Sequence, residues 1–136
     1  MTEEPKVTAE VLDKGHCAVE FVGERKKLTS SKVAKEDEVT PVHMFLSGLL
    51  ACVLMNADAA LREEGIDAEV TGEATGERDF DRGAITDIHV KIRVKLRDDT
   101  DPEKAKKVAE RGADRCIISR TLGHAIVHKE VIVERE

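Results

Sequence analysis

A long uncharged stretch in the middle of the sequence most constrains how this chain can fold. No side chain between residues 39 and 57 carries a formal charge, although charged residues make up 37% of the chain. Thr40 can cap the first N–H groups of a helix, Pro41 suits the first helical position, and Gly65 can end the helix in the left-handed conformation. The stretch therefore predicts a long, buried central helix over residues 40–65.

The length of this stretch argues against a membrane span. Residues 41–57 would rise only about 25 Å at 1.5 Å per residue, which is short of the ~30 Å hydrocarbon core. The helix then continues through charged residues between Asp58 and Glu64, which suits a solvated end. We therefore expect no membrane partner. Because the helix is apolar nearly all round, we expect protein to cover most of its sides, and a second subunit could supply part of that cover.

Composition narrows the class of protein further. The 136 residues and 15.0 kDa suit a single domain spanning residues 1–136. A formal charge of −6, a pI near 5.4 and the absence of Tyr and Trp argue against nucleic acid as a partner, because nucleic-acid binding needs basic surface and usually stacking aromatics. The first residues, MTEEPK, contain no apolar run, so we expect no signal peptide and a cytoplasmic protein.

Alternating apolar and polar residues predict strands on both sides of the central helix. Residues 32–39 are charged and irregular, which is typical of a solvated connection. A second, amphipathic helix is expected to begin at Pro102 after a cap at Asp101, and Cys116 points inward from its end. The order β-β-β-α-β-β-α-β, with antiparallel-looking strands, predicts an α+β fold. The expected strands cover residues 7–12, 17–22, 26–31, 67–78, 85–96 and 125–134.

Three cysteines are the candidate reactive side chains. In a reducing cytosol a disulfide among them would be transient or catalytic. Cys17, Cys52 and Cys116 contain no CxxC spacing, so a structural zinc is weakly supported, although Cys52, Cys116 and some of the five His could converge. Taken alone, Cys52 reads as a small core residue, since free cysteine is among the most buried types. We expect no metal and no cofactor.

Two motifs together resemble a known family. The first is T-P-x-x-x-F-L-S-G-L-L-A-C at residues 40–52, and the second is A-D-R-C-I-I-S-R-T-L-G at residues 113–123. Each motif alone is weak. Placed on two helices in this order, they resemble the OsmC/Ohr family of osmotically inducible and organic-hydroperoxide-resistance proteins, and the element order extends the resemblance over nearly the whole chain.

The resemblance implies a fold, an assembly and a reaction. The fold would be an OsmC-like α+β subunit that intertwines with a second copy into a homodimer, with the central helices buried back to back. Cys52 matches the peroxidatic cysteine of the family, and Cys116 matches the resolving one. Cys52 would attack the O–O bond of a small hydrophobic organic hydroperoxide, Cys116 would close a disulfide with it, and a dithiol reductant would reopen that disulfide.

The sequence departs from the family pattern where the thiolate needs support. Family peroxidases use an arginine from the N-terminal strands, held by a glutamate directly after the helix-opening proline. Val42 occupies the glutamate position here, and Lys14 or His16 is the nearest cation to the arginine position. His43 could also activate a thiol, although an ordinary first-turn residue is the favoured interpretation.

Three functional hypotheses follow. The first is a thiol-dependent redox protein, specifically a peroxidase toward organic hydroperoxides. The second is a non-catalytic protein of the same fold that binds a small hydrophobic ligand or acts as a thiol sensor. Val42 and the missing arginine favour the second, and the retained cysteine pair favours the first. A zinc-binding protein is the third and weakest.

Overall fold

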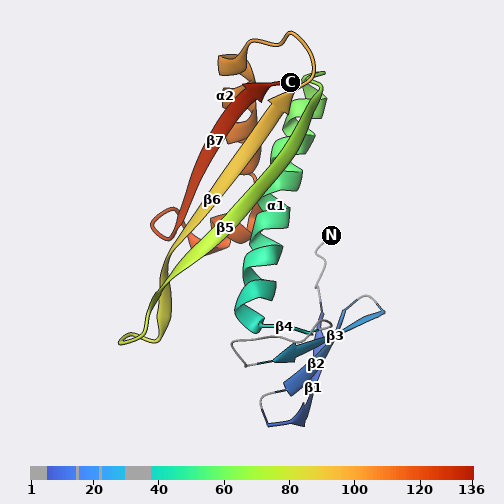
Figure 1. Cartoon of the computed structure of the whole chain (residues 1–136), viewed down its shortest axis with the longest axis vertical. Helices are drawn as coiled ribbons and strands as arrows, with labels where there is room; N and C mark the ends of the chain where they lie inside the picture. Colours follow the sequence, from blue (N-terminus) through green and yellow to red (C-terminus); the bar gives the residue numbers. More distant parts are fainter. Residues whose placement is uncertain (1–5, 15, 22, 30–37) are drawn as a thin grey trace. The chain divides into compact units, whose positions relative to one another are not determined.

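The computed structural model describes residues 6–14, 16–21, 23–29 and 38–136, which form two β-sheets and three helices (Figure 1). The chain divides into two compact units, residues 1–45 and 46–136. Both sheets and helices are present, so the predicted α+β class is confirmed. The single domain expected over residues 1–136 stays a prediction.

The N-terminal unit contains the predicted meander. Strands β1, Thr8–Asp13, β2, His16–Phe21, and β3, Glu24–Thr29, pair antiparallel in that order. A two-residue strand, β4, Glu38–Val39, pairs parallel with β3. The prediction of a connection was therefore wrong at residues 38–39, because their backbone groups extend the sheet. The ends predicted for strands at Val22, Ser30 and Ser31, and the connection at residues 32–37, lie outside the described residues.

Helix α1, Pro41–Glu63, begins and ends where its capping residues predicted. The hydroxyl of Thr40 accepts a hydrogen bond from the backbone N–H of His43 at 3.1 Å. At the other end Gly65 has a φ of 71°, and the N–H of Ile66 returns to the carbonyl of Leu61 at 2.9 Å. This closure satisfies a carbonyl that the helix leaves open, and glycine adopts such a φ without a Cβ clash.

The second unit is built on a three-stranded sheet in the order β5-β6-β7. Strands β5, Ala68–Asp79, and β6, Ala84–Leu96, form an antiparallel hairpin, and β7, Val127–Arg135, pairs parallel with β6. The antiparallel sheets expected from the sequence are therefore wrong for this last pair. Residues 97–126 contain two helices that carry the chain back to the start of β6, and such a crossover makes the next strand parallel.

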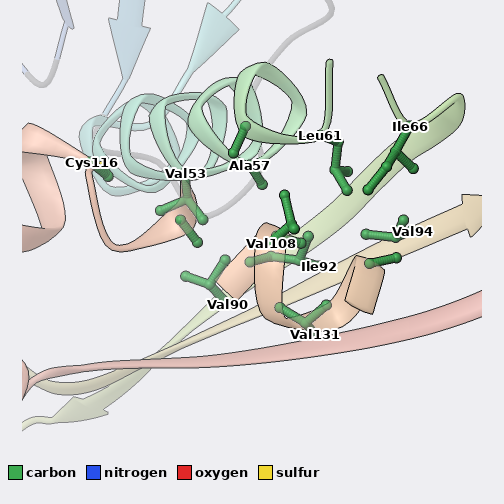
Figure 2. Packing of buried hydrophobic residues seen from close by; sticks show 14 of the residues in the cluster. Val53, Ala57, Leu61, Ile66, Val90, Ile92, Val94, Val108, Cys116 and Val131 are labelled. Atoms are coloured by element: carbon green, nitrogen blue, oxygen red, sulfur yellow. The ribbon is translucent and has the colours of Figure 1, made fainter. Parts of the chain in front are cut away.

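One face of this sheet carries the core, and the other carries charge. Helices α1 and α2, Pro102–Ala113, pack on the apolar face (Figure 2). On the opposite face the basic side chains of β6 form a row that is exposed or half-buried, and Glu73 of β5 lies within 4 Å of Lys91 and Arg93. That row is thus a solvated, ion-paired surface. The fully buried members of the core include Leu49, Val53, Ala57, Ile92, Val94, Leu96, Ala105 and Ala109.

Burial of α1 within this chain is one-sided. Leu49, Val53 and Ala57 are fully buried, whereas Met55 is 69% exposed. By length and composition α1 is one helix that could cross a bilayer. However, its buried stripe packs on a sheet whose other face is charged, and lipid around α1 would bring those charges toward hydrocarbon. Cover of the exposed stripe by a second subunit stays a prediction.

The junction after α2 also differs from the prediction. Helix α2 ends at Ala113, and a short third helix, α3, follows over Ile117–Leu122. Cys116 is consequently the N-cap of α3 and does not belong to α2. Asp101 occupies the N-cap position of α2, but its side chain makes no capping hydrogen bond, and Pro102 follows it as predicted.

Candidate functional site

Cys52 lies in the middle of α1, where one side of the helix is open. Its side chain is half-buried. Gly48, one turn earlier on the same face, is exposed, and a Cβ built on it would meet no atom within 4 Å. Within the described chain, a small molecule could therefore approach the sulfur along the surface at Gly48.

Cys116 lies in the α2–α3 junction and is completely buried. As the N-cap of α3, its sulfur accepts a hydrogen bond from the backbone N–H of Ser119 at 3.4 Å. The hydroxyl of Ser119, itself buried, donates to the carbonyl of Cys116 at 3.3 Å. The two bonds fix the backbone and the side chain of Cys116 together.

The two thiols lie close enough for each to shift the pKa of the other. Burial raises the pKa of the Cys52 thiol, and the neighbouring Cys116 raises it further, against the backbone N–H groups of Ile118 and Ile117. Burial also acts to raise the pKa of Cys116. There, interactions with Cys52 and Ser119 outweigh burial, so the pKa of Cys116 is lowered. Because the thiols interact, they lose their protons as a coupled pair.

A close helix crossing brings Cys116 to Cys52. At Gly112 the backbone of α2 lies so near α1 that an added Cβ would be 2.6 Å from both the carbonyl oxygen of Asn56 and the Cβ of Ala60. Only glycine allows this approach without a shift of backbone. Because Gly112 lies four residues before Cys116, this crossing determines where the sulfur of Cys116 lies relative to α1.

Lys129 of β7 fixes the end of α2 from the other side. Its ammonium group donates to the carbonyl of Ala113 at 3.1 Å and lies 3.2 Å from the carboxylate of Asp114, and its side chain is only 11% exposed. A cation at a helix C-terminus satisfies a free carbonyl and opposes the negative end of the helix dipole. The turn that leads to Cys116 is thereby anchored to the sheet.

The three candidate thiolate-stabilising residues lie in the N-terminal unit. His43, in the first turn of α1, has its ring nitrogen Nδ1 2.6 Å from the hydroxyl of Thr40. Lys14 is exposed in the turn between β1 and β2, and His16 begins β2. Their roles at Cys52 stay predictions.

Cys17, His89 and His128 make local contacts. The Cys17 thiol donates to the carbonyl of Ala18 at 3.7 Å within β2. His128 lies 2.8 Å from the carboxylate of Asp87 and stacks on His89, with ring centroids 5.1 Å apart. Among the described residues, no three His, Cys, Asp or Glu side chains are arranged to hold a metal ion.

Two residues at the site were missed as functional residues. The side chain of Asn56 contacts the Cys52 sulfur at 3.6 Å. Its position four residues after Cys52 was the available signal, since residues at that spacing are neighbours on a helix. Nothing in the sequence alone revealed the close helix crossing at Gly112.

Both the sequence and the fold of this chain are similar to those of known proteins. The sequence model described as OsmC-like protein matches residues 34–131. An uncharacterized protein of Methanocaldococcus jannaschii is 33% identical over 132 residues, covering 97% of this chain and 69% of that protein. The crystal structure of an OsmC like protein from Mycoplasma pneumoniae superposes with a TM-score of 0.83 at 20% identity, covering 99% of both chains. The organic hydroperoxide resistance protein OhrB of Bacillus subtilis gives 0.60 at 22% identity, covering 98% of both chains.

Proposed function

Because the chain belongs to the OsmC-like protein family, we propose that it is a thiol-dependent redox protein that reduces organic hydroperoxides through Cys52 and Cys116. The observation that carries the proposal is the proximity of the two thiols, one partly exposed and the other buried, which lets each shift the pKa of the other. A thiol that is reached from outside can react first, and a buried thiol in contact with it can resolve the product. The similar structure from Bacillus subtilis bears the name of a hydroperoxide resistance protein, which agrees with this chemistry.

The proposed cycle has three steps. The thiolate of Cys52 attacks the O–O bond, which breaks; the sulfur is oxidised to a sulfenic acid, and the alkoxide takes a proton and leaves as an alcohol. The sulfur of Cys116 then attacks the sulfenic sulfur, an S–S bond forms, and hydroxide leaves with the thiol proton as water. A dithiol reductant returns two electrons and two protons and is itself oxidised to a disulfide.

The coupling of the two thiols bears on the first step. Burial and the neighbouring Cys116 raise the pKa of Cys52, so only a small fraction of Cys52 is thiolate near neutral pH. The proposed first step therefore depends on groups that stabilise the Cys52 thiolate.

The proposal also includes an assembly and a compartment. We place the protein in the cytoplasm, where thiols are kept reduced between turnovers. A second copy of the chain would cover the exposed stripe of α1, which includes the half-buried Leu50 and the exposed Ala51 and Met55. Sedimentation of the purified protein would report a dimer, and a monomer at micromolar concentration would contradict this part.

The decisive experiment measures consumption of an alkyl hydroperoxide with a dithiol reductant. Cys52→Ser should lower the rate at least 100-fold, because a hydroxyl is a far weaker nucleophile than a thiolate. Cys116→Ser should stall Cys52 as a sulfenic acid after the first oxidation, and a second equivalent of hydroperoxide should convert it to a sulfinic acid that is visible by mass spectrometry. Cys17→Ser is the matched control and should retain the parent rate.

Two outcomes would overturn the proposed activity. Parent-level consumption in Cys52→Ser would show that the nucleophile lies elsewhere. If the Cys17→Ser variant is oxidised and no disulfide forms between Cys52 and Cys116, then Cys116 does not resolve the intermediate.

The raised pKa of Cys52 favours a second candidate, a slow thiol sensor that keeps the fold and site without efficient turnover. Val42, in place of the family glutamate, supports the same view. A sensor would consume about one equivalent of hydroperoxide per subunit and stop even with excess dithiol. The same non-catalytic candidate could bind a small hydrophobic ligand at this site instead of a peroxide. Such binding would persist in the Cys52→Ser variant.

A further inference from the structure

The side chain of Asn56 lies on the reacting sulfur. One helical turn after Cys52, its amide nitrogen is 2.8 Å from the carbonyl oxygen of Cys52 and 3.6 Å from its Sγ. The side chain is half-buried, so water competes only partly for these contacts. Asn56 is also the only side-chain carboxamide in the sequence, which contains no Gln.

The carbonyl contact determines which end of the amide faces the sulfur. A carbonyl oxygen can only accept a hydrogen bond, so the atom 2.8 Å from it must be the NH₂ nitrogen. The same nitrogen carries a second hydrogen that is available for Sγ. The sulfur of Cys52 therefore faces a hydrogen-bond donor, and the carboxamide oxygen points elsewhere.

The backbone that carries Asn56 is held in place by α2. The carbonyl oxygen of Asn56 lies 2.6 Å from where a Cβ on Gly112 would be, so the two helices are in backbone contact at this residue. A donor that is already positioned needs little reorganisation when negative charge appears on its acceptor.

We propose that Asn56 is a catalytic residue of this site, whose amide N–H donates to the sulfur of Cys52 and stabilises the negative charge that forms there. The inference deepens the proposed function, since it supplies a neutral hydrogen-bond donor where family peroxidases use an arginine. Hydrogen bonds to charged groups are stronger than those to neutral ones, so the Asn56 contact strengthens as Cys52 ionises.

The test is the pH profile of Cys52 alkylation by iodoacetamide in a Cys17→Ser background, followed by mass spectrometry of the Cys52 peptide. Asn56→Leu removes the donor with little change in size, and we expect the midpoint of the profile to rise by about one pH unit. Asn56→Asp removes the N–H and adds a negative charge, so its midpoint should rise further. Asn56→Gln keeps a carboxamide and should recover part of the shift.

Ala59→Asp, on an exposed position of the same helix, is the matched control for added charge and should move the midpoint less than Asn56→Asp. Circular dichroism of each variant distinguishes a lost donor from a lost fold. An unchanged midpoint in folded Asn56→Leu or Asn56→Asp would overturn the proposal, as would an equal shift in Ala59→Asp. The alkylation assay needs no hydroperoxide. A protein without peroxidase activity would therefore overturn the proposed function, while the alkylation midpoints would still test the role of Asn56.

Discussion

Cys52 and Cys116 carry the same side chain in opposite surroundings. Cys52 projects from the middle of a long helix, half-buried, and burial raises its pKa. Cys116 caps a short helix and is wholly buried, yet interactions with Cys52 and Ser119 lower its pKa despite burial. Cys52 is therefore the more accessible thiol, and Cys116 is the thiol whose pKa is lowered. The difference shows that backbone N–H groups and a neighbouring thiol can reverse the effect that burial has on a sulfur.

The largest predicted effect comes from a substitution at the crossing of α1 and α2, which would separate the two thiols. Gly112→Ala places a Cβ 2.6 Å from backbone of α1, so α2 must shift, and we expect the free energy of unfolding to fall by about 2 kcal/mol. Urea unfolding measures the loss, and a slower disulfide between Cys52 and Cys116 should accompany it. Gly48→Ala is the control, because its Cβ meets nothing and alanine favours a helix, so it should stabilise by about 0.5–1 kcal/mol.

A second prediction sharpens the difference in burial. Cys116→Ala leaves a cavity in the core and leaves the N–H of Ser119 without its acceptor, which should cost about 1.5 kcal/mol of stability. Cys52→Ala removes a half-exposed sulfur and should cost less than about 0.5 kcal/mol. Thermal and urea unfolding of the two variants side by side would test the contrast. Equal losses would show that the two sites are packed alike.

A smaller effect is expected where β7 holds the end of α2. Lys129→Met keeps the apolar stem but removes the bond to the carbonyl of Ala113, so we expect a loss of about 1 kcal/mol. Lys106→Met, on the exposed side of the same helix, is the matched control and should change stability by less than about 0.5 kcal/mol. Faster hydrogen exchange of the α2–α3 junction in Lys129→Met alone would show that the anchor acts on the Cys116 side of the pair. Unchanged exchange there would count against this role.

The subtlest prediction concerns the titration of each thiol alone. Cys116→Ala removes a neighbouring thiol that raises the pKa of Cys52, so that pKa should fall. Cys52→Ala removes an interaction that lowers the pKa of Cys116 and leaves burial opposed only by backbone and Ser119 groups, so that pKa should rise. Thiolate absorbance against pH, in a Cys17→Ser background, measures both. Shifts of the same sign would refute the coupling inferred between the thiols.

Local chemistry in the sequence predicted the individual elements well. Thr40, Pro41 and Gly65 located both ends of α1, because capping depends on residues next to one another in the chain. Strand β6 was equally clear, since one face is core and the other charged. Short-range patterns of this kind need no knowledge of the rest of the fold.

Arrangement in space was harder to predict. The parallel pairing of β7, the helix α3 and the one-sided burial of α1 all depend on partners distant in sequence. The two sulfurs were brought together in advance only by the family resemblance. The position of Asn56, four residues after Cys52, suggested a neighbour on the helix. Its contact with the Cys52 sulfur could be established only from the folded structure.

The parallel pairing of β6 with β7 determines when the thiol pair can assemble. Residues 97–126 must turn back across the sheet before the last strand can join it, and the Cys116 junction lies within that returning segment. Pairings between segments so far apart in sequence form slowly, because loop closure costs entropy before contacts are gained. We therefore expect Cys52 to lack a fixed resolving partner until β7 has joined the sheet.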